Sequence, residues 1–227
     1  MGQATVTGNG GRAALAKRCL FCLVGMFFYA TGVVLTKNCD LGISPITSVA
    51  YAMSLISGIT LGWCTSIFNL FLFVAQKWML GKDYTLKTLV GQAVMSVLFS
   101  LFIDGAGLLF GGVVPQSYPG RLILFVCGCL VLAFGMSMVI LAEFVILPAE
   151  GTVLAIQKKS GLSLGNVKIL FDAAMVLITV LLTLLCFRQV KGIREGTVLA
   201  VLLIGNFSKP IVRGLKNFLG STESRDI

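Results

Sequence analysis

Histidine is absent from the sequence, and charged residues make up only 12% of it. The chain therefore lacks the commonest general base, the commonest metal ligand and the usual partner of a catalytic serine or cysteine. Its seven cysteines lie almost all in apolar runs, where cysteine behaves as a small hydrophobic residue. No Gly-x-x-x-x-Gly-Lys nucleotide-binding loop occurs. We therefore expect neither an enzyme nor a bound metal or cofactor.

Hydrophobic residues, by contrast, make up 57% of the 227 positions, and the mean hydropathy is +0.97. A water-soluble chain needs more polar residues to solvate its surface, so the sequence predicts an integral membrane protein. Because a spanning helix takes about 20 apolar residues, the chain has room for roughly six spans and for no soluble domain. The net charge of +9 then indicates basic cytoplasmic loops and no nucleic-acid partner.

The predicted fold is all-α and polytopic, with six transmembrane helices and two shorter helices. Long apolar runs place the six spans at residues 19–36, 62–80, 88–103, 122–142, 166–187 and 196–212. Two further apolar segments, 45–57 and 148–157, are too short to span a membrane. Each begins with proline and is followed by a glycine, Gly58 or Gly161, which is typical punctuation of a short helix. We expect these helices to be re-entrant or interfacial.

The basic residues predict the orientation. Six spans and two re-entrant segments divide the 18 Lys and Arg residues 13 to 5 between the two sides, whereas full crossing by the short helices would divide them about 11 to 7. Because cytoplasmic loops carry the excess of Lys and Arg, the six-span arrangement is favoured, with both termini cytoplasmic.

The two halves of the chain form an internal repeat with an offset of 103 residues (121 − 18 = 103). Over residues 18–69, 12 of 52 aligned positions are identical, including the proline of each short helix and four glycine pairs in order. The domains that follow are an N-terminal tail, a first repeat, a linker, a second repeat and a C-terminal tail, at residues 1–17, 18–104, 105–120, 121–216 and 217–227.

Each repeat holds three spans, so the second repeat must enter the membrane from the opposite side to the first. Such an inverted repeat, with a short helix at matching positions in each half, is the plan of secondary transporters that alternate access to a midplane site. The alternative is that duplication only built a six-helix bundle. The paired glycines Gly25 and Gly32, and Gly128 and Gly135, are predicted to let helices pack closely.

Both short helices are predicted to direct their N-termini into the membrane, where backbone N–H groups and the helix dipole favour an anion or a polar solute. The alternative is a pair of interfacial helices that only bound the bundle. The expected substrate-binding residues lie at these N-termini and in the following span of each repeat: Ser44, Thr47, Asn69, Glu150, Gly151 and Asp172.

Asp172 and Glu150 are also the candidates for proton coupling, because each is a carboxylate at depth and a desolvated carboxylate readily takes up a proton. Their repeat partners, Asn69 and Thr47, are polar but neutral. For Glu150 a role as a cap of its own helix is about equally expected.

Three further segments carry a family resemblance: Leu41-Gly42-Ile43-Ser44-Pro45, then Ser57-Gly58-Ile59-Thr60-Leu61-Gly62, then residues 196–205 in the last span. With the glycine-spaced first span, they make residues 18–215 resemble the bacterial YitT/YczE-type membrane proteins, which are described mostly as predicted permeases. The resemblance implies a bacterial inner-membrane location and brings no substrate and no site residues.

The leading hypothesis is a secondary transporter that moves a small polar or anionic solute by rocking the two repeats about a midplane site, with proton coupling as an option. The alternative is a non-transporting membrane subunit or sensor that supports a partner protein. An intramembrane enzyme ranks third. The expected partners are the solute and the lipid bilayer, and homo-oligomerisation is left open.

Overall fold

The structure, a computed structural model, describes residues 9–81, 84–142 and 146–223. Every regular element in these residues is an α-helix, so the predicted all-α class is confirmed for the described chain. In chain order the helices are α1 (Asn9–Asn38), α2 (Pro45–Ser57), α3 (Leu61–Leu80), α4 (Leu86–Phe110), α5 (Tyr118–Ala142), α6 (Pro148–Ser160), α7 (Leu164–Phe187) and α8 (Glu195–Glu223).

Five of these helices are long and apolar enough to cross a membrane: α4, α5, α7, the segment Ala16–Asn38 of α1 and the segment Glu195–Lys216 of α8. With several such helices the protein is embedded in a membrane and polytopic. The remaining long helix, α3, has 20 residues but is not among the five. Asn69, Gln76 and Lys77 lower its hydropathy, and the first two of these side chains are buried inside the protein.

The two short helices form where the sequence predicts them. Pro45 and Pro148 each stand in the first turn, where the missing N–H of proline costs nothing. Gly58 and Gly161 end the helices in the left-handed conformation, with nearly the same angles (φ 71°, ψ 2° and φ 70°, ψ 3°). The second short helix continues to Ser160, three residues beyond the predicted end.

Helices α1 and α5 cross closely through their glycines, as the sequence predicts. A Cβ added to Gly32 would lie 2.5 Å from the Cβ of Leu132, and one added to Gly25 would lie 2.7 Å from that of Met138. A Cβ added to Gly135 would collide with the backbone of Tyr29. Contacts at increasing positions of α1 fall at decreasing positions of α5, so the two helices are antiparallel.

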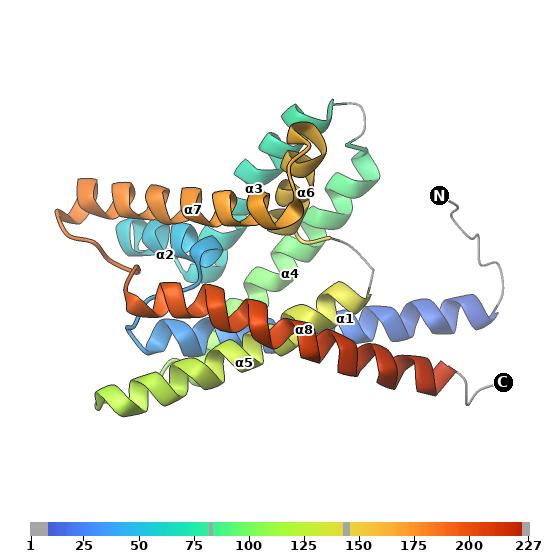
Figure 1. Cartoon of the computed structure of the whole chain (residues 1–227), viewed down its shortest axis with the longest axis horizontal. Helices are drawn as coiled ribbons and strands as arrows, with labels where there is room; N and C mark the ends of the chain where they lie inside the picture. Colours follow the sequence, from blue (N-terminus) through green and yellow to red (C-terminus); the bar gives the residue numbers. More distant parts are fainter. Residues whose placement is uncertain (1–8, 82–83, 143–145, 224–227) are drawn as a thin grey trace.

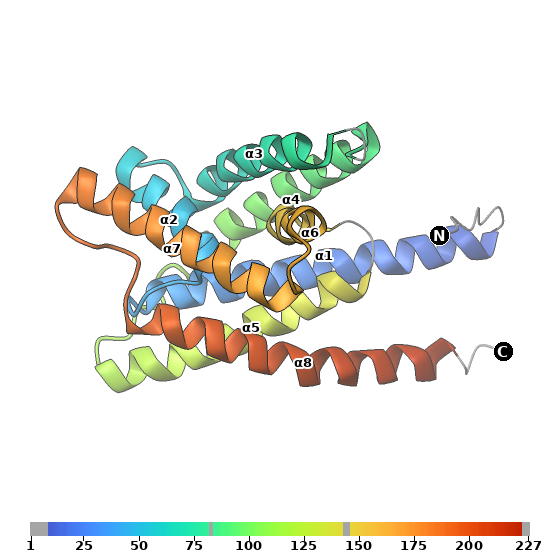
Figure 2. The ribbon, with the colours of Figure 1, turned by 45° about the horizontal axis from the view of Figure 1, so that its top comes forward.

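The eight helices form two groups of four. In the first, which we call the α1 group, α1 packs against α4 and α5, and α5 against α8. In the second, the α2 group, α2 and α6 each pack against both α3 and α7. Among the closely packed helix pairs, α3 with α4 is the one pair that connects the α1 group to the α2 group. Figures 1 and 2 show α1, α5 and α8 side by side along the molecule, with α6 running across them.

The packing of the two halves corresponds pair by pair. Exchanging α1 with α5, α2 with α6, α3 with α7 and α4 with α8 maps every close pair onto another close pair or onto itself, with one exception. The exception is α3 with α4, since α7 and α8 do not pack comparably. The start of α1 and the end of α8 lie at the same end of the molecule (Figures 1 and 2).

The segments between and beyond the repeats are more helical than predicted. The sequence predicts a linker over residues 105–120, but α4 continues to Phe110 and α5 begins at Tyr118. Gly105 and Gly107 are tolerated inside α4 because transmembrane helices accept glycine. Likewise α8 runs without a break through Pro210 into the predicted C-terminal tail. Residues 1–8 and 224–227, the outer parts of the predicted tails, lie outside the described residues.

Candidate functional site

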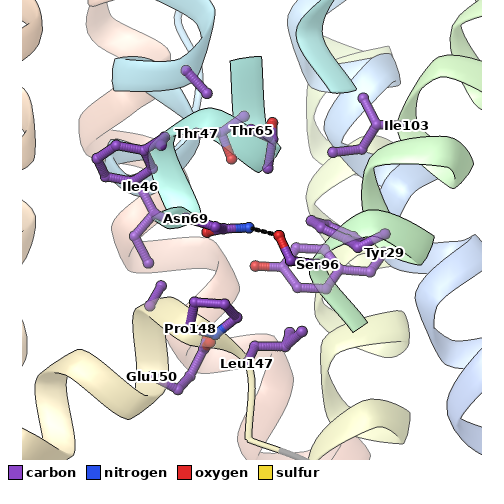
Figure 3. Close-up of a pocket in the computed structure, with 14 residues that line it drawn as sticks. Tyr29, Ile46, Thr47, Thr65, Asn69, Ser96, Ile103, Leu147, Pro148 and Glu150 are labelled. Carbon is purple, nitrogen blue, oxygen red and sulfur yellow. Dashed lines mark hydrogen bonds between the residues drawn. The ribbon is translucent and has the colours of Figure 1, made fainter. Parts of the chain in front are cut away.

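A partly open pocket lies between the two helix groups, and about 490 Å³ of space, open solvent included, is free of protein atoms there. Both short helices contribute their first turns to it. The α1 group supplies one wall with Tyr29 of α1 and with Ser96, Phe99 and Ile103 of α4. The α2 group supplies the remaining lining: Ile46, Thr47, Ala50, Thr65, Phe68, Asn69, Leu147, Pro148, Ala149 and Glu150. In Figure 3, Thr47 and Thr65 lie above Asn69, and Pro148 and Glu150 lie below it.

Thr47 and Glu150 occupy the same place in their helices and in the repeat (150 − 47 = 103). Each is the third residue of a short helix whose N-cap side chain makes no capping hydrogen bond. As an acidic residue in the first turn of α6, Glu150 interacts favourably with the positive end of the helix dipole. Its Oε1 atom is buried and has no hydrogen-bond partner among the described residues.

Asn69 stands in the middle of the pocket on α3. Its Nδ2 donates to Ser96 Oγ of α4 at 2.6 Å, and Figure 3 shows this bond. One turn earlier, Thr65 donates its hydroxyl hydrogen to the carbonyl oxygen of Leu61 at 2.7 Å. The structure therefore brings together three of the six predicted site residues: Thr47, Asn69 and Glu150.

The other three predicted residues do not line the pocket. The Ser44 hydroxyl pairs with that of Thr47 at 2.9 Å and is not part of the pocket lining. A Cβ added at Gly151 would point towards Gln76 of α3 and Gln92 of α4 and not into the pocket lining. Asp172 forms an ion pair of 2.8 Å with Lys168, one turn earlier on α7, although both lie within electrostatic range of Glu150. Its side chain is only 13% exposed, so the predicted carboxylate at depth is neutralised by its own helix.

A buried polar network that the sequence patterns did not predict holds the first turn of α6. Gln76 Nε2 donates to the carbonyl oxygen of Pro148 at 3.0 Å and to Thr152 Oγ1 at 3.2 Å. Gln92 Nε2 donates to Gln76 Oε1 at 3.2 Å. Tyr84 donates to Gln92 Oε1 at 2.7 Å, and burial raises the pKa of Tyr84 above its ordinary value, so the phenol keeps this hydrogen. The signal for this network lies in the sequence, since amides deep in an apolar span need partners as carboxylates do.

The first turn of α2 is held in the corresponding way. Thr179 of α7, the repeat partner of Gln76 (179 − 76 = 103), hydrogen-bonds to Ser48 Oγ at 2.7 Å. Ser48 in turn donates to the carbonyl oxygen of Pro45 at 2.6 Å. Each short helix is thus anchored by a side chain of a long helix of the other repeat, α6 by Gln76 of α3 and α2 by Thr179 of α7.

The chemical groups of the pocket lining are mostly neutral. Glu150 is the single charged residue in the pocket lining, and no Lys or Arg contributes to it. Among the described residues there is no group of three or more histidine, cysteine, aspartate or glutamate side chains that could hold a metal ion. The lining instead combines one carboxylate, hydroxyl and amide groups, and three aromatic rings.

Fold and pocket together define a polytopic helical membrane protein with an internal pocket lined by the first turns of two short helices. The chain belongs to DUF6198, a family of unknown function, whose model matches residues 16–213. No curated protein and no solved structure matches the chain.

Proposed function

We propose that the chain is a secondary transporter that moves a small polar solute across the bacterial inner membrane by alternating access. The observation that carries this proposal is that the first turns of α2 and α6, matched segments of the two halves, line one pocket. Inverted-repeat transporters build their midplane sites from half-helices in this way. The resemblance to YitT/YczE-type proteins agrees with a permease and stays a prediction.

The proposed topology is an inverted repeat with six spans, α3 being the sixth. Trp63 and Trp78, near the two ends of α3, are 63% and 81% exposed. They are 15 residues apart (78 − 63 = 15), about 22 Å along a helix, and exposed tryptophans mark the two faces of a bilayer. The antiparallel crossing of α1 and α5, repeat partners, supports a two-fold axis in the membrane plane. With six spans both termini face one side, which the distribution of Lys and Arg makes cytoplasmic.

Lys159, at the end of α6, supports a re-entrant α6. Its Nζ lies 5.0 Å from the centroid of the Trp78 ring, at one end of α3. A lysine over an interfacial tryptophan supports a position of the C-terminal end of α6 at the membrane surface. The N-terminal turn, with Pro148 and Glu150, then points into the membrane towards the pocket.

The mechanism we propose divides the molecule between the helix groups rather than between the repeats. The pocket lies between the α1 group and the α2 group, and each group contains two helices of each repeat. In this structure α3 is closed against α4, whereas α7 is not closed against α8. Alternating access would exchange these two contacts, closing α8 on α7 as α4 separates from α3.

The lining also bears on the charge of the solute. Helix N-termini alone favour an anion, as expected from the sequence. The charged side chain in the pocket lining is the acidic Glu150, and its buried Oε1 has no partner among the described residues, so a polar solute without negative charge is favoured. Glu150 is also the better candidate for proton coupling, because Asp172 is committed to Lys168.

The function is tested by screening solutes for stabilisation of the purified protein and by measuring the flux of each hit into proteoliposomes, with and without a pH gradient. We expect saturable flux that is lost in Glu150→Gln and that responds to the gradient. The alternative, a non-transporting subunit or sensor, predicts no flux for any hit. Flux that persists undiminished in both Glu150→Gln and Asp172→Asn would remove proton coupling by these carboxylates.

A further inference from the structure

The pocket presents hydrogen-bond acceptors to a ligand. Glu150 Oε1 has no donor among the described residues, although it is buried. The hydroxyl hydrogen of Thr65 goes to a backbone carbonyl, and an amide hydrogen of Asn69 goes to Ser96. The Oδ1 atom of Asn69 lies on the side of the amide away from Ser96, facing the pocket (Figure 3). A ligand that brings hydrogen-bond donors can therefore pair with Glu150 Oε1 and Asn69 Oδ1.

The charge of the pocket calls for a cation. A buried carboxylate oxygen without a partner is costly, and the site keeps it only if a proton or a positive group completes it. Lys168, a cation that acts electrostatically on Glu150, is already bound to Asp172 at 2.8 Å and does not line the pocket. Glu150 stands in the first turn of α6, near the positive end of that helix, and its buried Oε1 atom has no partner among the described residues and is left for a ligand.

The walls of the pocket favour an organic cation over a metal ion. Tyr29 and Phe99 pack with ring centroids 4.8 Å apart at an angle of 49°, and Phe68 adds a third ring to the lining. Aromatic faces attract ammonium groups, and cages of such rings with a carboxylate are the common way to bind alkylammonium ions. Hydrated sodium or potassium gains little from aromatic walls.

The geometry points to a binding site for a small organic ammonium ion, whose positive group pairs with Glu150 Oε1 against the rings of Tyr29 and Phe99. This inference rests on the proposed function and names its substrate class. Binding of the cation and of a proton at Glu150 exclude each other, so a solute cation entering from one side would release one proton from this carboxyl group. The titratable and charged groups that act on Glu150 are Tyr29 of α1 and Lys168 and Asp172 of α7.

The test measures binding of radiolabelled ethylamine to the purified full-length protein in detergent, with unlabelled tetramethylammonium, sodium, acetate or acetamide as competitors. We expect saturable binding that tetramethylammonium competes and that acetate, acetamide and sodium do not. Lowering the pH from about 8 to about 5 should weaken it, because protons compete for the carboxylate. Glu150→Gln should weaken it about tenfold or more.

The matched control is Glu195→Gln, which removes an exposed carboxylate next to Arg194, away from the pocket, and should leave ethylamine affinity unchanged. If Glu150→Gln does not fold, the Phe99→Leu variant tests the inference instead. Loss of one aromatic wall should weaken the binding of tetramethylammonium about tenfold without changing the charge of the pocket. Competition by acetate, equal competition by sodium, absence of saturable binding, or unchanged affinity in Glu150→Gln or Phe99→Leu would each overturn the inference.

The two proposals fail separately. Saturable ammonium binding without flux of any hit of the solute screen into proteoliposomes would remove the transporter and leave the ammonium site. Flux of a neutral or anionic solute, with no ammonium binding, would remove the ammonium site and leave the transporter.

Discussion

Gln76 Nε2 lies 3.0 Å from the carbonyl oxygen of Pro148, so a side chain of the first repeat holds the first turn of the short helix of the second repeat. Thr179 and Ser48 do the same in the opposite direction. Each short helix is therefore hydrogen-bonded to a long helix of the other repeat, although it adjoins the helices of its own repeat in the chain. Any rigid motion must carry α6 with α3 and α2 with α7, which is why the helix groups are the natural moving units.

Replacing Gln76 by leucine should destabilise the protein. The change removes two hydrogen bonds to α6 and leaves Gln92 Nε2 without one of its acceptors. Buried hydrogen bonds in membrane proteins contribute about 0.6 to 1.7 kcal/mol each, so we expect a loss of about 1 to 3 kcal/mol in the free energy of unfolding. The measurement is unfolding in mixed micelles. Gln116→Leu, at an exposed loop position, is the control, and an equal effect of both changes would contradict the anchoring role.

Gly151→Ser should be destabilising, although its repeat partner is a serine. A Cβ at Gly151 would lie 2.7 Å from Gln76 Oε1 and from Gln92 Nε2, whereas Ser48 faces the smaller Thr179. Adding Gln76→Thr to Gly151→Ser recreates the pair found on α2 and should recover part of the lost stability. Unfolding of the two single variants and of the double variant gives the coupling energy. If the double variant lost as much stability as the two single variants lose together, the proposed correspondence between the Gly151–Gln76 pair and the Ser48–Thr179 pair would be contradicted.

The antiparallel crossing of α1 and α5 predicts which glycines are needed for folding. Gly32→Ala places a Cβ 2.5 Å from the Cβ of Leu132 and should cost about 1 to 3 kcal/mol or prevent folding. Gly105→Ala, on α4, meets no atom within 4 Å and should leave stability unchanged or raised. Size-exclusion profiles of fluorescent fusions and melting temperatures would show the difference, and equal tolerance of both changes would argue against the close crossing.

The sequence predicts a large part of this fold for identifiable reasons. Proline and glycine at a fixed offset locate the two short helices, and the same offset pairs Thr47 with Glu150 from the sequence alone. The ion pair between Lys168 and Asp172 can also be predicted from the sequence, because residues four positions apart in a helix lie on the same face. The walls formed by Tyr29 and Phe99, and the division into two helix groups, depend on how different helices meet. Apolar periodicity in a membrane protein carries little of that information, because lipid-facing and buried residues are equally apolar.

Gly165, the repeat partner of Gly62 (165 − 62 = 103), should report on the proposed exchange of contacts. At Gly62 an added Cβ would collide with the Ser100 carbonyl of α4, whereas at Gly165 it meets no atom within 4 Å. Gly165→Leu should therefore fold and bind ligand as the unmodified protein does, yet it would block the approach of α8 to α7.

We expect an unchanged dissociation constant and a transport rate lowered about tenfold or more, which corresponds to at least about 1.4 kcal/mol on the barrier. Gly107→Leu, an equally open glycine on α4, is the matched control and should transport normally. Ligand binding and proteoliposome flux measured on the same preparations separate the two effects. Normal flux in Gly165→Leu would mean that this face of α7 meets lipid throughout the cycle, and access would then have to alternate by a motion that leaves α7 and α8 apart.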